Sequence, residues 1–105
     1  MKVLYLTTTG RVSGLPREIE IWFVSAGGNL YLLAEHFHET KWVRNTLADP
    51  RVRIRLGDRE FAATARVLDH ELDRNTWDLA QRLSQEKYGW GDGLPVEISS
   101  PEYGG

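Results

Sequence analysis

The amino-acid sequence predicts a mainly β protein of the α+β class, a small and partly open antiparallel barrel of about five to six strands with two helices. Three observations lead to this prediction. Apolar and polar residues alternate over several short runs, glycine-bearing turns join neighbouring runs into hairpins, and two further stretches show the spacing of helices. With 105 residues and no repeat or linker, the chain is expected to form a single domain over residues 1–105.

Two hairpins are expected in the first part of the chain. Residues 3–6 are a short apolar run and residues 18–24 alternate, which predicts two strands joined by the loop 10–17. In the second of these strands we expect one face to carry Ile19, Ile21 and Phe23 and the other to carry Glu18, Glu20, Trp22 and Val24. The sequence Gly27-Gly28-Asn29 then predicts a turn into a strand at residues 30–34.

A short helix is expected at residues 41–47, after a polar connection. Thr40 or His38 can cap its start, and Asp49 before Pro50 marks its end. The residues of its apolar face would be Trp42, Val43, Thr46 and Leu47. The amino-terminal N–H groups of such a helix offer a place for an anion.

A further hairpin is predicted for the middle of the chain. Residues 51–56 alternate without a fault, with three arginines on one face and three aliphatic residues on the other. The sequence Gly57-Asp58 is typical of a two-residue turn, and residues 60–68 would form the partner strand. Its inward residues would be Phe61, Ala63, Ala65 and Val67, whose small members permit the close packing of a barrel wall.

The last part of the chain predicts a helix and an irregular tail. Helical spacing begins at Asp69 or His70 and continues to about Tyr88, with Gly89 as the end of the helix. The stripe on its apolar face would consist of Leu72, Thr76, Leu79, Ala80, Leu83 and Lys87. Residues 90–98 are rich in turn residues and have room for one short strand.

Composition excludes several classes of function. The net charge is −2, so no global field attracts the chain to nucleic acid or to an anionic membrane. The absence of cysteine excludes disulfides and thiolate chemistry. No apolar run approaches the roughly 20 residues of a membrane span, and the start lacks the features of a signal peptide, so we expect a cytoplasmic protein.

The loop 10–17 is the main candidate for a binding site. It holds two glycines, one proline, two arginines and a serine within eight residues. Glycine lets a ligand approach main-chain N–H groups, and the guanidinium of arginine is shaped to bind phosphate or carboxylate. These residue types indicate an anion cradle, although an ordinary hairpin loop with solvated charges fits them too.

A longer pattern includes this loop. The run Leu6-Thr7-Thr8-Thr9-Gly10-Arg11-x-Ser13-Gly14-x-Pro16-Arg17 is followed by two strands around a glycine turn, then by Trp42-x-x-Asn45 and Pro50. This pattern resembles the deazaflavin-dependent nitroreductase family, a branch of the flavin and deazaflavin oxidoreductases, over roughly residues 4–68. The resemblance implies a split β-barrel that binds coenzyme F420 and transfers a hydride to an organic acceptor such as a quinone or a nitro compound.

The resemblance also implies roles for individual residues. The coenzyme tail would contact Arg11, Ser13, Arg17 and Lys41. Main-chain groups around Leu33, Ala34 and His36 would line the ring, with Tyr88 as the candidate catalytic residue and Trp22 and Trp90 in the substrate pocket. The expected partners are a small-molecule electron acceptor and a second copy of the chain, because such barrels often share the cofactor cleft between subunits.

Two positions depart from the family pattern. Val12 stands where a second basic residue is common, and the acidic, histidine-bearing segment 35–39 replaces a glycine-rich or serine-bearing turn. FMN is therefore the alternative coenzyme. A barrel that binds flavin, a haem breakdown product or a fatty acid without turnover is the alternative function.

Other candidate features have simpler interpretations. The aromatic residues fit a core or a dimer contact as well as a ring pocket. His36 and His38 lie two apart, but a structural zinc site needs four ligands and no thiolate is present, so no metal site is predicted. The arginine face of residues 51–55 could bind single-stranded nucleic acid, but carboxylates at Glu18, Glu20 and Glu60 could pair with it, so an ion-paired face is predicted.

Overall fold

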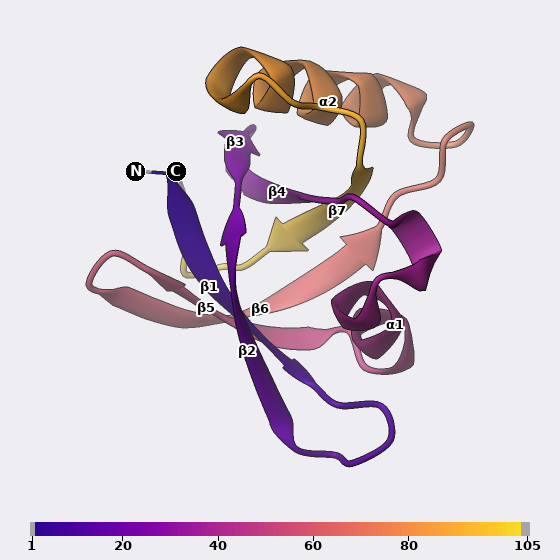
Figure 1. The fold of residues 1–105 in the computed structure, drawn as a ribbon. Coiled ribbons are helices and arrows are strands. Elements are labelled where there is room, and N and C mark those ends of the chain that lie inside the picture. The colour runs from indigo at the N-terminus through magenta and orange to yellow at the C-terminus, as the bar shows by residue number, and fades with distance from the viewer. Residues whose placement is uncertain (1, 104–105) are drawn as a thin grey trace.

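The computed structural model describes residues 2–103 and contains one curled antiparallel sheet with two α-helices (Figure 1). Its strands are β1 (Val3–Thr9), β2 (Pro16–Trp22), β3 (Val24–Ala26), β4 (Asn29–Ala34), β5 (Arg51–Leu56), β6 (Arg59–Val67) and β7 (Leu94–Ser99). A 3-10 turn η1 (Phe37–Glu39) and helix α1 (Lys41–Ala48) follow β4, and helix α2 (Arg74–Tyr88) precedes β7. The predicted fold class is confirmed, with seven strands where five to six were expected.

The two edges of the sheet meet at a single residue. In the sheet the strands follow the order β2-β1-β5-β6-β7-β4-β3, so β2 and β3 lie at opposite ends although they are consecutive in the chain. Only Phe23 separates them, and the Cα atoms on either side of one residue lie no more than about 7 Å apart. The sheet must therefore curl until its edges meet at Phe23, which produces the partly open barrel (Figure 1).

The backbone of Phe23 makes its hydrogen bonds to α2 and not to a neighbouring strand. Its N–H donates to the Tyr88 hydroxyl at 3.0 Å, and its carbonyl accepts from Lys87 Nζ at 2.9 Å and from the Tyr88 hydroxyl at 2.7 Å. The side chains of Phe23 and Val24 are both buried, so the alternation fails at this point. The expectation of one continuous strand over residues 18–24 is wrong, because the chain changes sheet edge at Phe23.

Helix α1 matches its expected range, but its buried face is rotated. Leu47 is 58% exposed, whereas Asn45 is buried together with Trp42, Val43 and Thr46. The expectation that Leu47 faces the core is wrong. Thr40 occupies the capping position, but its side chain makes no capping hydrogen bond.

Helix α2 begins later than expected. The Asp69 carboxylate accepts the N–H groups of Glu71 and Leu72 at 2.9 Å, and the Asp73 carboxylate accepts the N–H of Asp69 at 2.8 Å. These bonds hold residues 69–73 in turns ahead of the helix. The helix ends at Gly89 as predicted, where φ is +76°.

The buried stripe of α2 also differs from the expected one. Trp77, Ala80 and Ser84 are its buried residues, while Leu72 lies outside the helix and is 88% exposed. Ala80 is the one expected stripe residue that is fully buried. The later start of the helix removes Leu72 from the periodic pattern on which the expectation was built.

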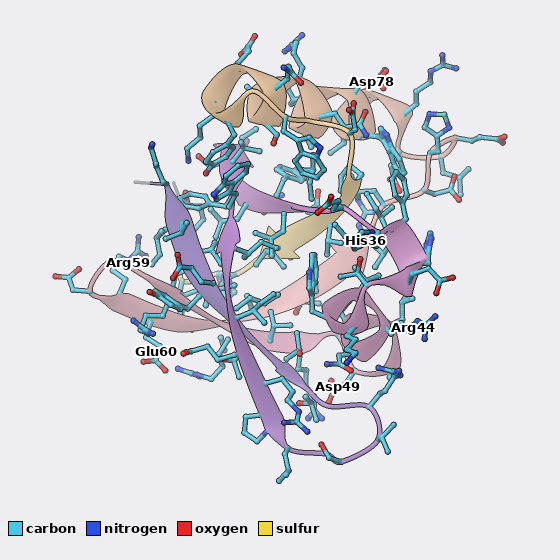
Figure 2. All side chains as sticks on the ribbon, viewed as in Figure 1. His36, Arg44, Asp49, Arg59, Glu60 and Asp78 are labelled. Carbon is cyan, nitrogen blue, oxygen red and sulfur yellow. The ribbon has the colours of Figure 1, made fainter. Side chains whose placement is uncertain are left out.

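The hairpin of β5 and β6 follows its prediction closely. Val52 and Ile54 are buried, and the arginines between them are exposed. Arg53 pairs with Glu60 at 3.3 Å and Arg55 pairs with Glu18 at 3.4 Å, as the ion-paired interpretation requires. Glu60 is labelled beside this hairpin in Figure 2.

Two further observations complete the fold. Glu20 accepts a hydrogen bond from the Tyr5 hydroxyl at 3.2 Å and forms no pair with the arginine face.

In the part of the chain that the structure describes, neither helix is long and apolar enough to cross a membrane.

We expect the turn ahead of α2 to make the fold sensitive to acid. Hydrogen bonds from the Leu72 and Glu71 N–H groups lower the pKa of Asp69, and the Asp69 N–H and the Arg66 guanidinium lower the pKa of Asp73. Because each folded-state pKa lies below the unfolded value, this stabilisation is complete above about pH 4 and is lost as the pH falls through the lower folded values.

Asp73→Asn should therefore reduce the fall in Tm between pH 7 and pH 2.5, measured by circular dichroism. Asp92→Asn is the matched control, because Asp92 is exposed. An acid-induced fall in Tm that is as steep in Asp73→Asn as in the parent chain would contradict this account.

Candidate functional site

A cavity of about 920 Å³ lies between the β1–β2 loop and the start of α1. Its lining residues include Arg11, Ser13, Arg17 and Lys41, the four residues predicted to hold an anionic tail. Glu18 is the one carboxylate among its described lining residues. We call this cavity the anion cradle.

The loop that forms one wall of the cradle is held by its own hydrogen bonds. The Gly10 N–H donates to the Leu15 carbonyl and the Gly14 N–H donates to the Gly10 carbonyl, both at 2.8 Å. A Cβ atom at Gly10 would lie 2.7 Å from Ser13 Oγ and 3.2 Å from the Leu15 carbonyl oxygen, and Gly14 has φ +72°, so both positions favour glycine. The two glycines therefore favour a compact loop, and its arginines are exposed.

Asn45 connects this loop to α1. Its side chain is buried, and its Oδ1 accepts hydrogen bonds from the Arg11 N–H at 3.2 Å and from Arg11 Nη1 at 3.4 Å. Its Nδ2 donates to Thr8 Oγ1 at 3.1 Å, and Thr8 is also buried. Asn45 was not predicted to be a site residue, although it is part of the Trp42-x-x-Asn45 pattern, which was the available signal in the sequence.

The cradle fits an anion in two respects. Arg11, Arg17 and Lys41 form no ion pair in residues 2–103, so their charges face the cavity without a protein counter-ion. Thr40 also lines the cavity, and its hydroxyl is buried and has no hydrogen-bond partner in the same range. An anionic ligand would neutralise the first set of groups and accept a hydrogen bond from the second.

A second cavity, of about 550 Å³, adjoins β2 further along the strand. It lies between β2 and the end of β4. The lining residues that the structure describes are Val3, Glu20, Ile21, Trp22, Leu33, Glu35 and Trp90. The predicted residues Trp22, Leu33 and Trp90 thus come together. We call it the aromatic cleft; its two carboxylates, Glu20 and Glu35, were not predicted as site residues from the sequence.

Tyr88 lies behind the aromatic cleft. Its ring stacks on Trp22 with 4.5 Å between ring centroids and 5° between planes. Its hydroxyl contacts the backbone of Phe23 and the Lys2 carbonyl, and Tyr88 is not among the described lining residues of the cleft. Tyr88 therefore contacts Trp22 through its ring, and its hydroxyl is hydrogen-bonded to the backbone.

Trp90 is positioned by the segment that follows α2. Its carbonyl accepts from Ser84 Oγ at 2.6 Å, and the Gly93 carbonyl accepts from Gln81 Nε2 at 2.9 Å. A Cβ atom at Gly91 would lie 2.2 Å from the Gln81 carbonyl oxygen, so the segment approaches the helix as closely as glycine permits. These contacts with α2 hold the segment that carries Trp90 beside the cleft. No local sequence pattern indicated them.

The remaining predicted residues lie apart from both cavities. Ala34 is buried at the end of β4, and His36 is exposed on the connection before α1, as Figure 2 shows. Neither is among the described lining residues of the cradle or the cleft. No three potential metal ligands come together within residues 2–103.

Comparisons with known proteins identify a family and similar solved structures. The model of a family described as F420H(2)-dependent quinone reductase matches residues 1–101. A solved structure described as an F420-H2 dependent reductase (FDR-A) is similar at 27% identity over 94% of each chain, with a TM-score of 0.68.

Two further solved structures are similar. One described as a domain-swapped dimer shares 27% identity over 94% of this chain and 80% of that one, with a TM-score of 0.68. HutZ, the heme storage protein from Vibrio cholerae, shares 19% identity over 93% of this chain and 80% of its own, with a TM-score of 0.75. At that identity the likeness to HutZ concerns the fold alone.

Asn45→Ala should lower the free energy of unfolding by about 1–3 kcal/mol, because the Thr8 hydroxyl and the Arg11 N–H both lose a buried partner. It should also speed amide hydrogen exchange at Arg11, which would show that the loop has loosened. Urea denaturation and exchange mass spectrometry measure the two effects.

Asn75→Ala serves as the control, since Asn75 is exposed on α2 and its replacement should change stability by about 0.5 kcal/mol or less. Unchanged exchange at Arg11 in Asn45→Ala would refute the anchoring role.

Proposed function

Because the chain belongs to the F420H(2)-dependent quinone reductase family and is therefore an oxidoreductase that uses coenzyme F420, we propose that it reduces a quinone. The observation that supports this proposal is the position of the two cavities. A basic cavity and an aromatic one adjoin the same strand, β2, in the order that a long cofactor with an acidic tail and a flat ring requires. A nitro compound is the alternative acceptor.

In this proposal the anion cradle binds the acidic tail of the coenzyme. Arg11 and Arg17 provide guanidinium groups suited to phosphate and carboxylate oxygens, and Lys41 adds a charge at the start of α1. Ser13 shapes the loop, since its Oγ accepts the Leu15 N–H at 3.1 Å. The site thus provides several donors on a framework that is formed before the ligand arrives.

The aromatic cleft would receive the ring and the acceptor. When bound, reduced F420 supplies a hydride, that is, two electrons with one proton, and the quinone becomes a hydroquinone by taking a second proton from solvent. Leu33, Trp22 and Trp90 would give the flat ring apolar walls. The protein's part is to bind, orient and shield the reactants.

Tyr88 would act on this site through Trp22. Its hydroxyl holds the junction at Phe23 and its ring supports the indole, so we assign it a positioning role. This assignment modifies the expectation that Tyr88 is catalytic, because a hydroxyl engaged by two backbone carbonyls is poorly placed to protonate an acceptor.

A homodimer is part of the proposal. Trp22 is 47% exposed although it lines the cleft, and a second copy laid against β2 would cover it. A protein described as a domain-swapped dimer is among the similar structures.

Arg11→Ala and Arg17→Ala should each weaken F420 binding by about 1.5–3 kcal/mol, which corresponds to a rise in Kd of about 10-fold to 150-fold. Titration of the protein with F420, followed by the coenzyme's fluorescence, measures this. Arg74→Ala is the control, because Arg74 is exposed on α2, outside both cavities. If both cradle variants bind F420 with the affinity of the parent chain, the cradle does not bind the coenzyme tail. If the parent chain binds FMN more tightly than F420, the coenzyme is FMN.

Tyr88→Phe should raise the KM for the acceptor and leave kcat within about tenfold of the parent value, because the ring stays while its anchor is lost. A proton donor would instead lower kcat by about 100-fold or more. Steady-state kinetics at saturating F420H2 separate the two roles. Tyr103→Phe is the matched control, since Tyr103 stacks on Phe61, away from the cleft.

A further inference from the structure

The two cavities on β2 carry opposite charge. The cradle's charged lining residues are Arg11, Arg17, Lys41 and Glu18, which leaves an excess of two positive charges. The aromatic cleft has Glu20 and Glu35, and no lysine, arginine or histidine is among its lining residues in the described chain. The sign of the local charge therefore reverses between Arg17 and Glu20, within one strand.

Neither carboxylate of the cleft has a cationic partner within residues 2–103. Glu20 accepts a hydrogen bond from the neutral Tyr5 hydroxyl, which leaves its charge in place. Glu35 follows β4 directly, is exposed, and takes part in no ion pair in the same range. By contrast, Glu39 and Glu60 both pair with arginines.

The other lining residues of the cleft are apolar and include two indoles. Low-dielectric walls concentrate the field of nearby charges, so the two carboxylates act more strongly on a ligand in the cleft than they would on open surface. Indole faces also attract cations. Both effects favour the same class of ligand.

We propose that Glu20 and Glu35 determine the charge selectivity of the acceptor site, which takes flat aromatic acceptors that are neutral or cationic and rejects anionic ones. This inference rests on the proposed function, because it concerns the acceptor that shares the cleft with the coenzyme ring. The selection acts on binding: the acceptor gains the same hydride and solvent proton whatever its substituents.

A matched pair of quinones tests it. The ratio of kcat/KM for menadione to that for 1,4-naphthoquinone-2-sulfonate is measured in the parent chain and in Glu20→Gln, Glu35→Gln and the double variant. The two quinones differ in intrinsic reactivity, but this difference cancels when the ratio is compared between variants. Each substitution should lower the ratio about threefold to tenfold at low salt, and 0.5 M salt should reduce the effect.

The control is the double variant Glu71→Gln/Glu102→Gln, which removes the same charge at two exposed positions outside the cleft. Its ratio should stay within about twofold of the parent value. A ratio that is unchanged in Glu20→Gln/Glu35→Gln, or that shifts equally in the control, overturns the inference.

A binding experiment separates this inference from the proposed function. F420 affinity is measured by fluorescence in the parent chain and in each cleft variant, so that the kinetic ratios are compared at saturating coenzyme; absence of F420 binding in the parent defeats the proposed function alone. Without coenzyme, methylene blue, a cationic tricyclic dye, should quench the tryptophan fluorescence at lower concentration than resorufin, an anionic one. The Glu20→Gln/Glu35→Gln variant should lose this preference; equal affinity for the two dyes in the parent chain overturns the inference.

Discussion

One residue, Phe23, joins the two free edges of the sheet, and the location of the site follows from that junction. Because β2 and β3 are consecutive in the chain but lie at opposite ends of the strand order, the sheet has to close at Phe23 and can open only away from it. At this junction the backbone groups of Phe23 find their hydrogen-bond partners on α2. The N–H donates to the Tyr88 hydroxyl, and the carbonyl accepts from Lys87 Nζ and from the Tyr88 hydroxyl. The aromatic cleft lies between β2 and the end of β4.

The strand that leaves the junction serves both cavities. Glu20 to Trp22 face the cleft and Pro16 to Ile19 face the cradle, so β2 sets the distance between the two sites. The far end of β2 is fixed by the loop, whose conformation depends on Gly10 and on the Asn45 side chain. In the proposed function, β2 would thereby align an anion in the cradle with a ring in the cleft.

The sequence predicted those parts of the molecule whose signals are local. The alternation of β5, the glycine turns and the loop 10–17 as a candidate anion site follow from spacing or residue type within a short segment, whereas the set of four cradle residues came from the family resemblance. The break at Phe23 was not predictable in this way, since it depends on hydrogen bonds from Tyr88, 65 residues away. The same applies to Asn45, whose partners Thr8 and Arg11 lie on another element, and to Glu20 and Glu35, which meet only because β2 and β4 border the same cleft.

The segment 35–39, where the sequence departs from its family's pattern, acts on the cleft and not on the cradle. Glu39 pairs with Arg44 at 2.8 Å, and Arg44 also donates to the His38 carbonyl, so this part of the segment is tied to the outer side of α1 (Figure 2). None of its residues is among the described lining residues of the cradle, whereas Glu35 lines the cleft. The acidic replacement therefore adds no carboxylate to the cradle and one carboxylate, Glu35, to the cleft. In the proposed function, this departure would therefore bear on the acceptor and not on the coenzyme tail.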